Sequence, residues 1–585
     1  MNINKFHFLA IVLIAIMFFL AFLSIKNESL TMDELPHLPA GYSYLTQKDM
    51  RINPEHPPLI KDIAAIPLLF IKNINFPGDH KSWIEDVNGQ WDFGNKFLFK
   101  SGNPADEMIF YGRIMMILVL MVFAAVVYFF VYKNFGGPIA LLTLFLFCFS
   151  PSLLAHGRLI TTDIGAAFGV FLTIFTFFNF LKNPSKKNIL FASLALAFAE
   201  LVKFSNIILF PYLIIIAFVW WLINRKDFKK LALNLILIFI LFFIFILPVY
   251  QYHVLNYPVE RQVSDIQFLL KNINNQVLVK SLVWMADKPI LMAYAQYFLG
   301  VFMVMMRAVG GNTTYFLGEI TNVGWQSYFP IVYLLKESLS FHILTIIAVL
   351  FAIYSFLFRE KKYGFYGFIE NMKNLLQKYF LEFCIFSYIV IYWITALKSN
   401  LNIGVRHLLP AILLTYILVA IGVFKFLEKQ GHLKIKIFFI CFLLSWQAAG
   451  IFIVFPHFIS YFNEIVGGYK NGYQYVVDSN YDWGQGLKRL KNWTQANNVE
   501  KIYLDYFGGA DIEYYFGNNY EKWWGERNPK EIPSGSYLAV SATFMQGGKG
   551  VLVKNFKAPS GYYLWLDQEN LVARPDPSIF VFKIK

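Results

Sequence analysis

The segment of this sequence best equipped for chemistry begins with two adjacent carboxylates, Asp33 and Glu34, just after the first apolar run. A carboxylate beside a substrate hydroxyl can act as its general base. The residues that follow add a proline-rich turn and side chains that can hold an anion: His37, Arg51, His56 and Lys61. Adjacent acids can also merely stabilise the first turn of a helix. The density of ionisable groups over residues 33–61 favours a functional site.

Two further polar clusters stand near the ends of later apolar runs. His156 and Asp163 border a short connection, where Asp163 can cap the following helix and still take part in chemistry. Glu200 and Lys203 lie three residues apart and could simply neutralise each other. Ionisable residues in apolar stretches are costly and usually functional, which makes Lys203 a candidate for holding an anionic lipid headgroup.

Arg406 and His407 precede another apolar run, within the segment Asn402–Pro410. Arg406 can extend its charge to the membrane surface while its stem stays among apolar groups. Its guanidinium also matches the geometry of a phosphate. Its expected position beside the acids favours phosphate recognition.

A metal site stays open as an alternative. The histidines at 37, 56 and 156 could bind a divalent cation together with the acids, but no close metal-ligand spacing falls on one helix. Asp478 and Asp482 suggest a calcium loop, yet Trp483 stands where such a loop needs Gly and Arg489 where it needs Glu. An EF-hand is therefore excluded, and the metal remains optional.

The composition of the chain excludes a soluble globular protein. Hydrophobic residues make up 57% of the 585 residues, against ~45–50% in soluble domains, and charged residues 15%, against ~25%. Lipid must therefore cover apolar surface that a globular body could not hide. The three cysteines lie inside apolar runs and are expected to act as small hydrophobic side chains: Cys148, Cys384 and Cys441.

Apolar runs of ~17–25 residues predict about eleven transmembrane helices. The predicted spans are 8–25, 108–132, 137–155, 163–181, 189–203, 206–223, 231–250, 341–358, 380–397, 408–424 and 437–456. An uncleaved first span fits better than a signal peptide, because the first run is long and has no small-x-small cleavage site.

The distribution of Lys and Arg predicts the orientation. With the N-terminus inside, the six internal segments carry 18 basic and four acidic residues: 1–7, 132–136, 182–188, 224–230, 359–379 and 425–436. This excess equals the net charge of +14, so the basic balance is a positive-inside signal and needs no nucleic acid.

The long connections 26–107 and 251–340 and the tail 461–585 then fall on the outer face. The tail alternates short β-type runs with Gly, Pro and Asn turns, and the runs are 501–506, 537–541 and 579–584. We therefore expect a transmembrane catalytic domain over 1–460 and a small extracytoplasmic α/β domain over 461–585.

All the ionisable clusters share the predicted outer face. Acids there can deprotonate a nucleophile and cations can bind a phosphate, which fits lipid-linked group transfer. ATP is absent outside the cell, and the sequence has no phosphate-binding Gly-rich loop followed by Lys and Ser or Thr. An activated donor must then arrive attached to a lipid.

These motifs resemble a known group of enzymes. The pattern Asp33-Glu34…His37…Gly41-Tyr42…Arg51…Asn53-Pro-Glu-His56-Pro-Pro-Leu-Ile-Lys61 is similar to the first outer loop of phospholipid-carrier-dependent glycosyltransferases, the family 39-like group. That group includes protein O-mannosyltransferases and the aminoarabinose transferase that acts on lipid A. Segments around His156–Asp163, Lys203, Gly404–Pro410 and Asp478–Gln485 also resemble its bacterial members. The likeness covers most of residues 1–490, whereas the tail matches no domain we can name.

The resemblance implies a GT-C membrane fold and an inverting glycosyltransferase. Its donor would be a sugar on polyprenyl or dolichyl monophosphate, and its acceptor hydroxyl would belong to a protein, lipid or glycan. The resemblance assigns the general base to Asp33, and Glu34 and Asp163 would orient the acceptor or the sugar. The expected substrate-binding residues are Lys203 and Arg406 for the phosphate, then Arg51 and Lys61, with His37, His56, His156 and His407 shaping the pocket.

Two other classes of protein compete with this interpretation. A transporter or flippase for a lipid-linked glycan would also use buried charges, but it should show paired repeats with broken spans, and none is found. A non-catalytic binding module on an anchor needs only one or two spans. We expect a multi-pass protein of a bacterial plasma membrane, with its N-terminus in the cytoplasm and its C-terminus outside.

Cysteine labelling tests this topology. A membrane-impermeant thiol reagent added to intact cells should label single-cysteine variants at Arg51, Asn402 and Gly517. Variants at Ser185, Lys229 and Lys362 should react only after the membrane is opened. A cytoplasmic Gly517 would make the number of spans even and would separate the acidic loop from the tail.

Overall fold

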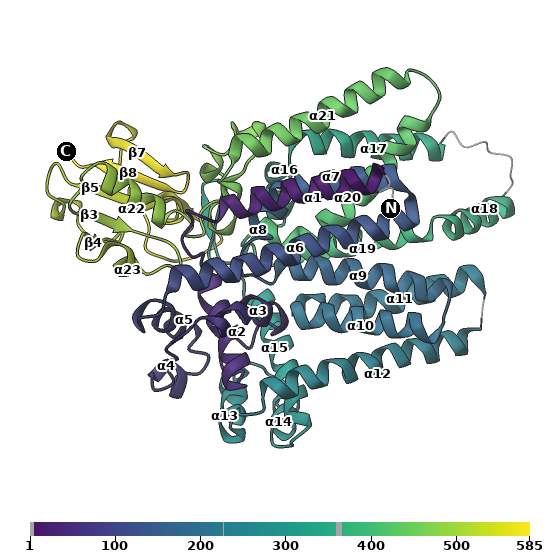
Figure 1. The fold of residues 1–585 in the computed structure, drawn as a ribbon, viewed down its shortest axis with the longest axis horizontal. Helices are drawn as coiled ribbons and strands as arrows, with labels where there is room; N and C mark the ends of the chain where they lie inside the picture. The colour runs from purple at the N-terminus through teal and green to yellow at the C-terminus, as the bar shows by residue number, and fades with distance from the viewer. Residues whose placement is uncertain (1–4, 226, 358–364) are drawn as a thin grey trace.

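The computed structural model describes residues 5–225, 227–357 and 365–585 (Figure 1). Long helices lie side by side along the longest axis of the molecule, and a small sheet-containing unit lies at one end. The first loop and this unit share that end, whereas the N-terminus lies toward the other. Lys362, together with residues 359–364 of the predicted internal segment, falls outside the described residues.

Ten helices among the described residues are long and apolar enough to cross a membrane. They are α1 (Lys5–Ser24), α6 (Ala105–Phe135), α9 (Asp163–Lys182), α11 (Leu209–Asn224, with the turn from Phe204), α12 (Phe228–His253), α15 (Leu291–Gly310), α17 (Leu339–Leu357), α19 (Phe380–Lys398), α20 (Leu409–Glu428, with the turn from Val405) and α21 (Leu433–Val454). A further helix, α18 (Phe365–Lys378), precedes α19. The predicted polytopic α-helical membrane fold with a small C-terminal α/β unit is confirmed.

Nine of the ten helices coincide with predicted spans, and the differences have local causes. The predicted span 137–155 divides into α7 (Gly137–Cys148) and α8 (Pro151–His156), because Pro151 starts a new helix that the Ser150 hydroxyl caps. The predicted span 189–203 is α10 (Lys186–Val202), whose 17 residues fall just short. Helix α15 was expected to belong to an outer loop.

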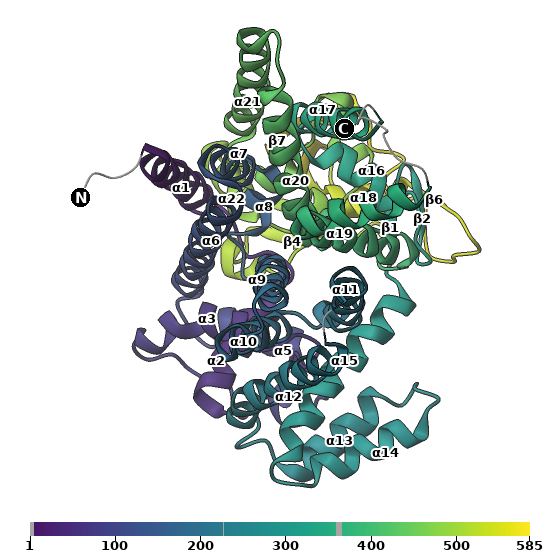
Figure 2. The same ribbon diagram turned by 90° about the vertical axis from the view of Figure 1, so that its right-hand side faces the viewer.

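The orientation of α15 differs from that of helices α9 and α11. In Figure 2, α9 and α11 are viewed nearly end-on, whereas α13 (Val259–Leu269), α14 (Gln276–Ala286) and α15 run across the view. Its apolar stretch also has a mean hydropathy of only 1.3, against 2.0 to 3.0 for all but one of the others. This weak signal explains why α15 escaped the hydropathy analysis.

Helices α9 and α20 form the centre of the bundle. In their most apolar stretches 83% and 72% of the residues are buried, compared with 17% in α12 at the periphery. Close packing is possible because Gly169 of α9 faces Ala199 of α10, where an added Cβ would lie 2.6 Å from the Ala199 Cα. The residues that begin α9 and precede α20 are therefore held on rigid central elements.

The first loop folds into short helices at the sheet-bearing end. They are α2 (Glu34–Gln47), α3 (Leu59–Ala65), α4 (Lys81–Ile84) and α5 (Gln90–Asn95). Helices α2 and α3 touch through Gly41, where an added Cβ would lie 2.1 Å from the carbonyl oxygen of Lys61. The proline-rich turn is thereby folded back onto the helix that starts at the paired acids.

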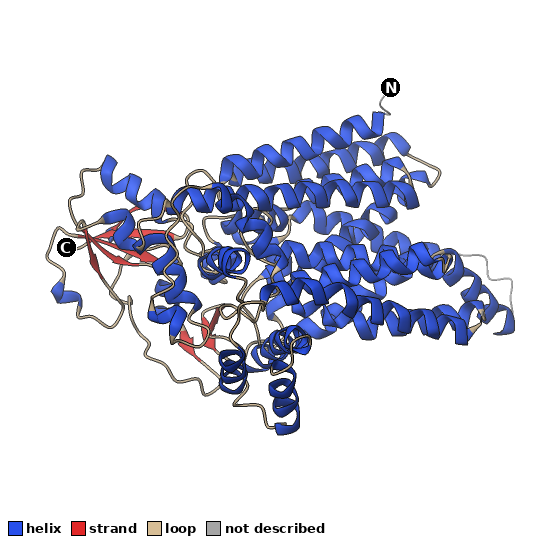
Figure 3. Ribbon diagram, turned by 60° about the horizontal axis from the view of Figure 1, so that its bottom comes forward, coloured by secondary structure: helices blue, strands red, loops and turns tan. Residues whose placement is uncertain are grey.

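The C-terminal unit contains a five-stranded mixed sheet (Figure 3). Its order is β4 (Tyr520–Lys522), β3 (Ile502–Asp505), β5 (Tyr537–Ser541), β8 (Ile579–Lys583) and β7 (Leu571–Asp576). Strand β3 pairs in parallel with β4 and β5, and β8 pairs antiparallel with β5 and β7. The unit's helices are α22 (Leu487–Ala496), α23 (Ile512–Phe516) and α24 (Ala542–Lys549). The three predicted β-type runs are confirmed as β3, β5 and β8.

A second, smaller sheet joins the C-terminal unit to the connection 251–340. The hairpin β1 (Thr314–Phe316) and β2 (Glu319–Thr321) pairs through β2 with β6 (Val551–Leu552). Helix α16 (Tyr328–Lys336) follows the hairpin. The proposed domain boundary at residues 460 and 461 therefore separates segments that share backbone hydrogen bonds, and it stays a prediction.

Candidate active site

The two adjacent acids at the start of α2 have different surroundings. Glu34 is fully buried, and its carboxylate accepts hydrogen bonds from the Arg113 guanidinium, at 2.8 and 2.5 Å, and from the backbone N–H of Thr31 and Ile160. Burial alone would raise the pKa of Glu34, but the Arg113 charge and these hydrogen bonds outweigh burial and lower the pKa. Glu34 is therefore occupied as a structural acid.

Asp33 lies just outside that buried network. Its side chain is 24% exposed, and its Oδ2 accepts a hydrogen bond from Arg406 Nη1 at 2.5 Å. The same nitrogen lies 3.3 Å from Oδ2 of Asp163, and the other oxygen of Asp163 pairs with Lys203 Nζ. The ends of four segments distant in sequence are thus joined by a charged row of alternating acids and cations, which consists of Asp33, Arg406, Asp163 and Lys203.

Local backbone geometry explains why Lys203 faces Asp163. Helix α10 ends at Val202, and Lys203 is extended, with φ −161° and ψ 125°. The alternative in which Glu200 and Lys203 neutralise each other is excluded, because Glu200 remains on the buried face of α10 and accepts instead from the Tyr297 hydroxyl at 3.0 Å.

The segment around Trp483 forms one wall of the site. The Arg406 guanidinium lies over the Trp483 ring, 4.3 Å from its centroid, and the ring fixes the direction of this cation. The backbone N–H groups of Ser29 and Met32 donate to the carbonyls of Gln485 and Trp483 at 3.1 and 3.0 Å. The C-terminal segment therefore holds both the acid-bearing loop and its cationic partner.

Two further acids lie on this segment. Burial raises the pKa of Asp478 to about 6, with Arg406 opposing the shift, and raises the pKa of Asp482 to about 7, with Thr543 opposing it. Asp482 accepts from the Thr543 backbone N–H at 2.8 Å, and its other oxygen is buried without a partner. Both carboxyl groups are poised to exchange protons near neutral pH.

The predicted histidines lie around the row of charges. His37 bonds the carbonyl of Ile160 at 2.8 Å, and its ring stands edge-on to His56, with centroids 4.9 Å apart. Burial, followed by the neighbouring His37 and Lys61, lowers the pKa of His56 well below its usual range, so His56 is neutral at pH 7. His156 lies beside Trp483, with ring centroids 5.9 Å apart.

Lys61 and Arg51 already have partners within the first loop. The buried Lys61 ammonium contacts four oxygens, those of the Tyr44 hydroxyl, the Asn53 carbonyl and side-chain amide, and the His56 carbonyl, at 2.7 to 3.0 Å. Burial lowers the pKa of Lys61 to about 7, and the negative charges of Glu55 and Asp62 oppose this shift. Arg51 pairs with Asp49 at 2.5 Å and stacks on Trp83. Their predicted roles in substrate binding stay predictions.

Three residues of the site escaped the sequence analysis. Arg113 anchors Glu34, and its signal was an isolated charge inside the long apolar helix α6. Trp483 had been considered only for its place in a calcium loop. Arg307, near the end of α15, is exposed and makes no ion pair with the described residues, and its charge acts on His56, His407 and Asp478. Its signal was its position in a loop expected on the same face as the acids.

The site contains no recognisable metal centre within the described part of the chain, where no group of three or more His, Cys, Asp or Glu side chains could hold a metal ion. What the arrangement offers is a partly exposed carboxylate paired with Arg406, with Lys203 on the far side of Asp163. The charge of Arg307 acts on other groups of the site. A carboxylate can take a proton from a hydroxyl, and such cations stabilise a phosphate oxyanion.

Comparison with known proteins agrees with this chemistry. Residues 9–263 match the family model described as dolichyl-phosphate-mannose-protein mannosyltransferase, which confirms the resemblance. No curated protein matches the chain significantly.

Several solved structures are similar at low sequence identity. The archaeal oligosaccharyltransferase AglB from Archaeoglobus fulgidus, in complex with an inhibitory peptide and a dolichol-phosphate, is 12% identical with a TM-score of 0.45, covering 87% of this chain and 64% of its own. ArnT from Cupriavidus metallidurans bound to undecaprenyl phosphate is 11% identical with a TM-score of 0.44, covering 98% and 97%. The Pmt1–Pmt2 complex of S. cerevisiae, bound to its sugar donor, is 18% identical with a TM-score of 0.35, covering 47% and 38%. The chain thus spans less than two thirds of the AglB chain.

The buried pair of Glu34 and Arg113 gives a stability prediction. Glu34→Gln or Arg113→Met alone should cost about 3–5 kcal/mol, because each leaves the other partner buried without its counter-charge. The double variant should lose less than the sum of the two. Thermal unfolding of the purified protein in detergent measures all three, with Lys501→Ala at an exposed ion pair as the control expected to unfold at the wild-type temperature. Additive losses would show that the two side chains do not interact.

Proposed function

We propose that this chain is an inverting glycosyltransferase that moves a sugar from a polyprenyl or dolichyl monophosphate carrier to an acceptor hydroxyl on the extracytoplasmic face. The observation that carries the proposal is the pairing of Asp33 with Arg406, since it places a partly exposed base next to a buried guanidinium at one end of the bundle. The family match over residues 9–263 favours an enzyme over a transporter.

The chemical step is a single displacement at the anomeric carbon. The acceptor oxygen forms a bond to that carbon while the bond to the phosphate oxygen breaks, and the configuration inverts. Asp33 takes the hydroxyl proton through the oxygen that faces away from Arg406. General-base assistance of this kind contributes ~10²–10⁴-fold in rate. The pairing with Arg406 fixes the direction of the Asp33 carboxylate before the acceptor binds.

The departing lipid phosphate needs cations more than a proton donor. The charges of Lys203 and Arg307 act on His56 and His407, and together with Arg406 these cations can receive the negative charge that develops on the phosphate. Arg307 makes no competing ion pair among the described residues, so it can turn toward the phosphate without breaking an existing contact.

Asp163 and Glu34 take positioning roles in this mechanism. Asp163 is 1% exposed and touches both Lys203 and Arg406, so it holds two cations at the spacing that the phosphate requires. Glu34 fixes the start of α2 and thereby the backbone of Asp33. The different partners of the two adjacent acids favour Asp33 over Glu34 as the base.

The general base is tested by comparing two variants in a single turnover. Asp33→Asn should slow transfer by ~10²-fold or more, because the amide keeps the shape of the side chain but cannot accept the proton. Its unfolding temperature and donor affinity should stay close to wild type. Glu34→Gln should instead lose folded protein, with the remaining folded fraction turning over normally. Normal transfer by Asp33→Asn would refute the mechanism.

The phosphate site is tested by donor binding. Lys203→Ala and Arg307→Ala should each weaken the binding of a lipid-phosphate sugar by about 10- to 100-fold, since a charged hydrogen bond is worth ~1.5–3 kcal/mol. Arg406→Lys should also weaken binding, because an ammonium lacks the planar fork of the guanidinium. Titration of the purified protein measures the affinity, with Lys501→Ala as the charge-matched control. Unchanged affinity in all three variants would make these cations structural.

A further inference from the structure

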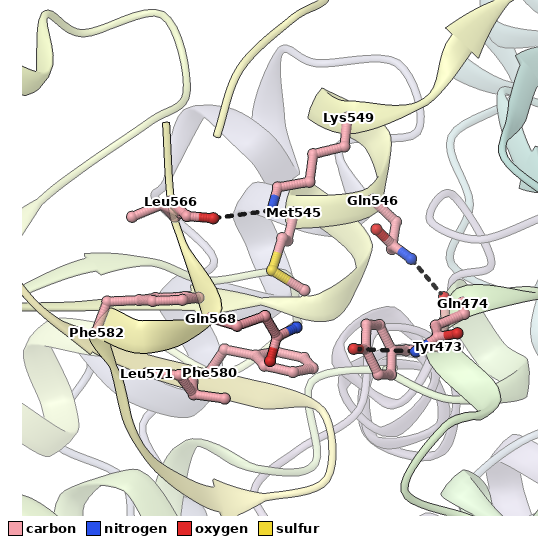
Figure 4. A pocket seen from close by; sticks show the side chains of 10 residues that line it. All are labelled: Tyr473, Gln474, Met545, Gln546, Lys549, Leu566, Gln568, Leu571, Phe580 and Phe582. Atoms are coloured by element: carbon pink, nitrogen blue, oxygen red, sulfur yellow. Dashed lines mark hydrogen bonds between the residues drawn. The ribbon is translucent and has the colours of Figure 1, made fainter. Parts of the chain in front are cut away.

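A cavity of about 180 Å³ lies in the C-terminal unit, away from the charged row (Figure 4). Its walls come from α24, from the edge strand β7 and its neighbour β8, and from the turn Gly472–Gln474. Three glutamine side chains, two phenylalanine rings, a tyrosine and one lysine are among the residues that line it. None of these groups takes part in the proposed transfer.

The lining selects a neutral ligand that carries several hydroxyl groups. The amides of Gln474, Gln546 and Gln568 can both donate and accept hydrogen bonds, as hydroxyl groups require. The rings of Tyr473 and Phe580 provide apolar surface for C–H groups. The described lining has no carboxylate to pair a cation and only one ammonium to pair an anion, so a charged ligand would be poorly matched.

Several polar groups that line this cavity have few or no hydrogen-bond partners among the described residues. The side-chain amide of Gln546 donates to the Tyr315 hydroxyl and to the Tyr473 carbonyl, at 3.2 and 3.0 Å. Its amide oxygen has no partner among the described residues. The Lys549 ammonium makes one long contact, 3.3 Å to the Leu566 carbonyl. The amide of Gln568 bonds to no described side chain or backbone group. These groups converge on the same space in Figure 4.

The size of the cavity limits the ligand to one ring. Pockets for drug-sized ligands occupy ~300–1,000 Å³, well above the 180 Å³ available here. A single pyranose fits this volume and presents hydroxyl groups at its edge and C–H groups on its face. A folded peptide segment does not fit.

One short helix connects the cavity with the candidate active site. At the start of α24, the Thr543 N–H donates to Asp482 and the Thr543 hydroxyl accepts from the backbone N–H of Asp478. At its end, Lys549 lines the cavity. Eight helical residues span roughly 12 Å at 1.5 Å each, so a sugar in the cavity and a hydroxyl near Asp33 belong to different residues of one chain.

We propose that this cavity binds one neutral sugar ring of the acceptor, so that the acceptor is a glycan. The identification of this sugar as part of the acceptor rests on the proposed glycosyl transfer. The binding of a sugar ring is inferred from the cavity alone. The ring would anchor the glycan while a hydroxyl of another of its sugars reaches Asp33.

Saturation-transfer NMR of the full-length protein tests the binding. The protein is kept in a detergent without a sugar headgroup, and the probes are the methyl glycosides of mannose, glucose and galactose, together with N-acetylglucosamine. At least one probe should bind. Lys549→Met should weaken it about tenfold, and Leu571→Trp, which fills the cavity from β7, should abolish binding. Gln495→Leu, on the exposed face of α22, is the matched control and should bind as wild type. No binding by any probe, or binding unchanged in both cavity variants, would overturn the proposal.

Transfer assays separate the two proposals. With a short oligosaccharide acceptor and a lipid-phosphate sugar, Lys549→Met should raise KM for the acceptor about tenfold and leave kcat unchanged. If peptide acceptors are turned over and their KM is the same in wild type and Lys549→Met, the proposal of a glycan acceptor is refuted and the proposed transferase activity is retained. Binding of a glycoside in the cavity without turnover by any acceptor would refute the transferase and retain the sugar site.

Discussion

The ion pair between Glu34 and Arg113 is the contact on which the geometry of the candidate site depends. Both side chains are almost completely buried, and such a pair is tolerated only when its oxygens and N–H groups find partners. Here both carboxylate oxygens and four of the five guanidinium N–H groups have partners, in the pair itself and in the backbone of residues 28, 29, 31 and 160. Because this network consumes one of two adjacent acids, the other is left at the rim with a different set of neighbours. The difference between a fully buried and a partly exposed carboxylate therefore arises from packing rather than from the residue type.

Arg406 connects the remaining parts of the site. It touches one acid at the start of α2, another at the start of α9 and an indole ring from the C-terminal segment. A guanidinium suits this position because it can contact several groups in its plane and a ring on its face. Its contact with Asp163 comes from the start of the central helix α9, and Arg406 itself directly precedes α20, so the cation is held by the buried centre of the bundle. In the proposed mechanism the membrane helices therefore position the charged groups, and the C-terminal unit forms a wall of the site.

The sequence predicted most of what depends on local properties. Nine helices were predicted from hydropathy, because a helix that crosses a lipid layer needs a run of consecutive apolar residues, and such a run is visible in the sequence. Asp33, Asp163, Lys203 and Arg406 were recognised as polar residues at the ends of apolar runs, although their mutual contacts were not. The pairing of Lys203 depends on where α10 ends, and the choice between Asp33 and Glu34 depends on Arg113, which lies 79 residues further along. The long-range partners Arg307 and Trp483 required the folded chain.

The hydrogen bonds between residues 29–32 and 483–485 can form only late in the synthesis of the chain. Ser29 donates to the Gly484 carbonyl across 455 residues of chain. At a synthesis rate of ~5–20 residues per second, the second partner emerges roughly half a minute or more after the first. During that interval the nascent loop has neither its backbone partner nor the indole ring that steadies Arg406. The contacts that hold the candidate site are therefore completed only after the segment that follows the last membrane helix has been made.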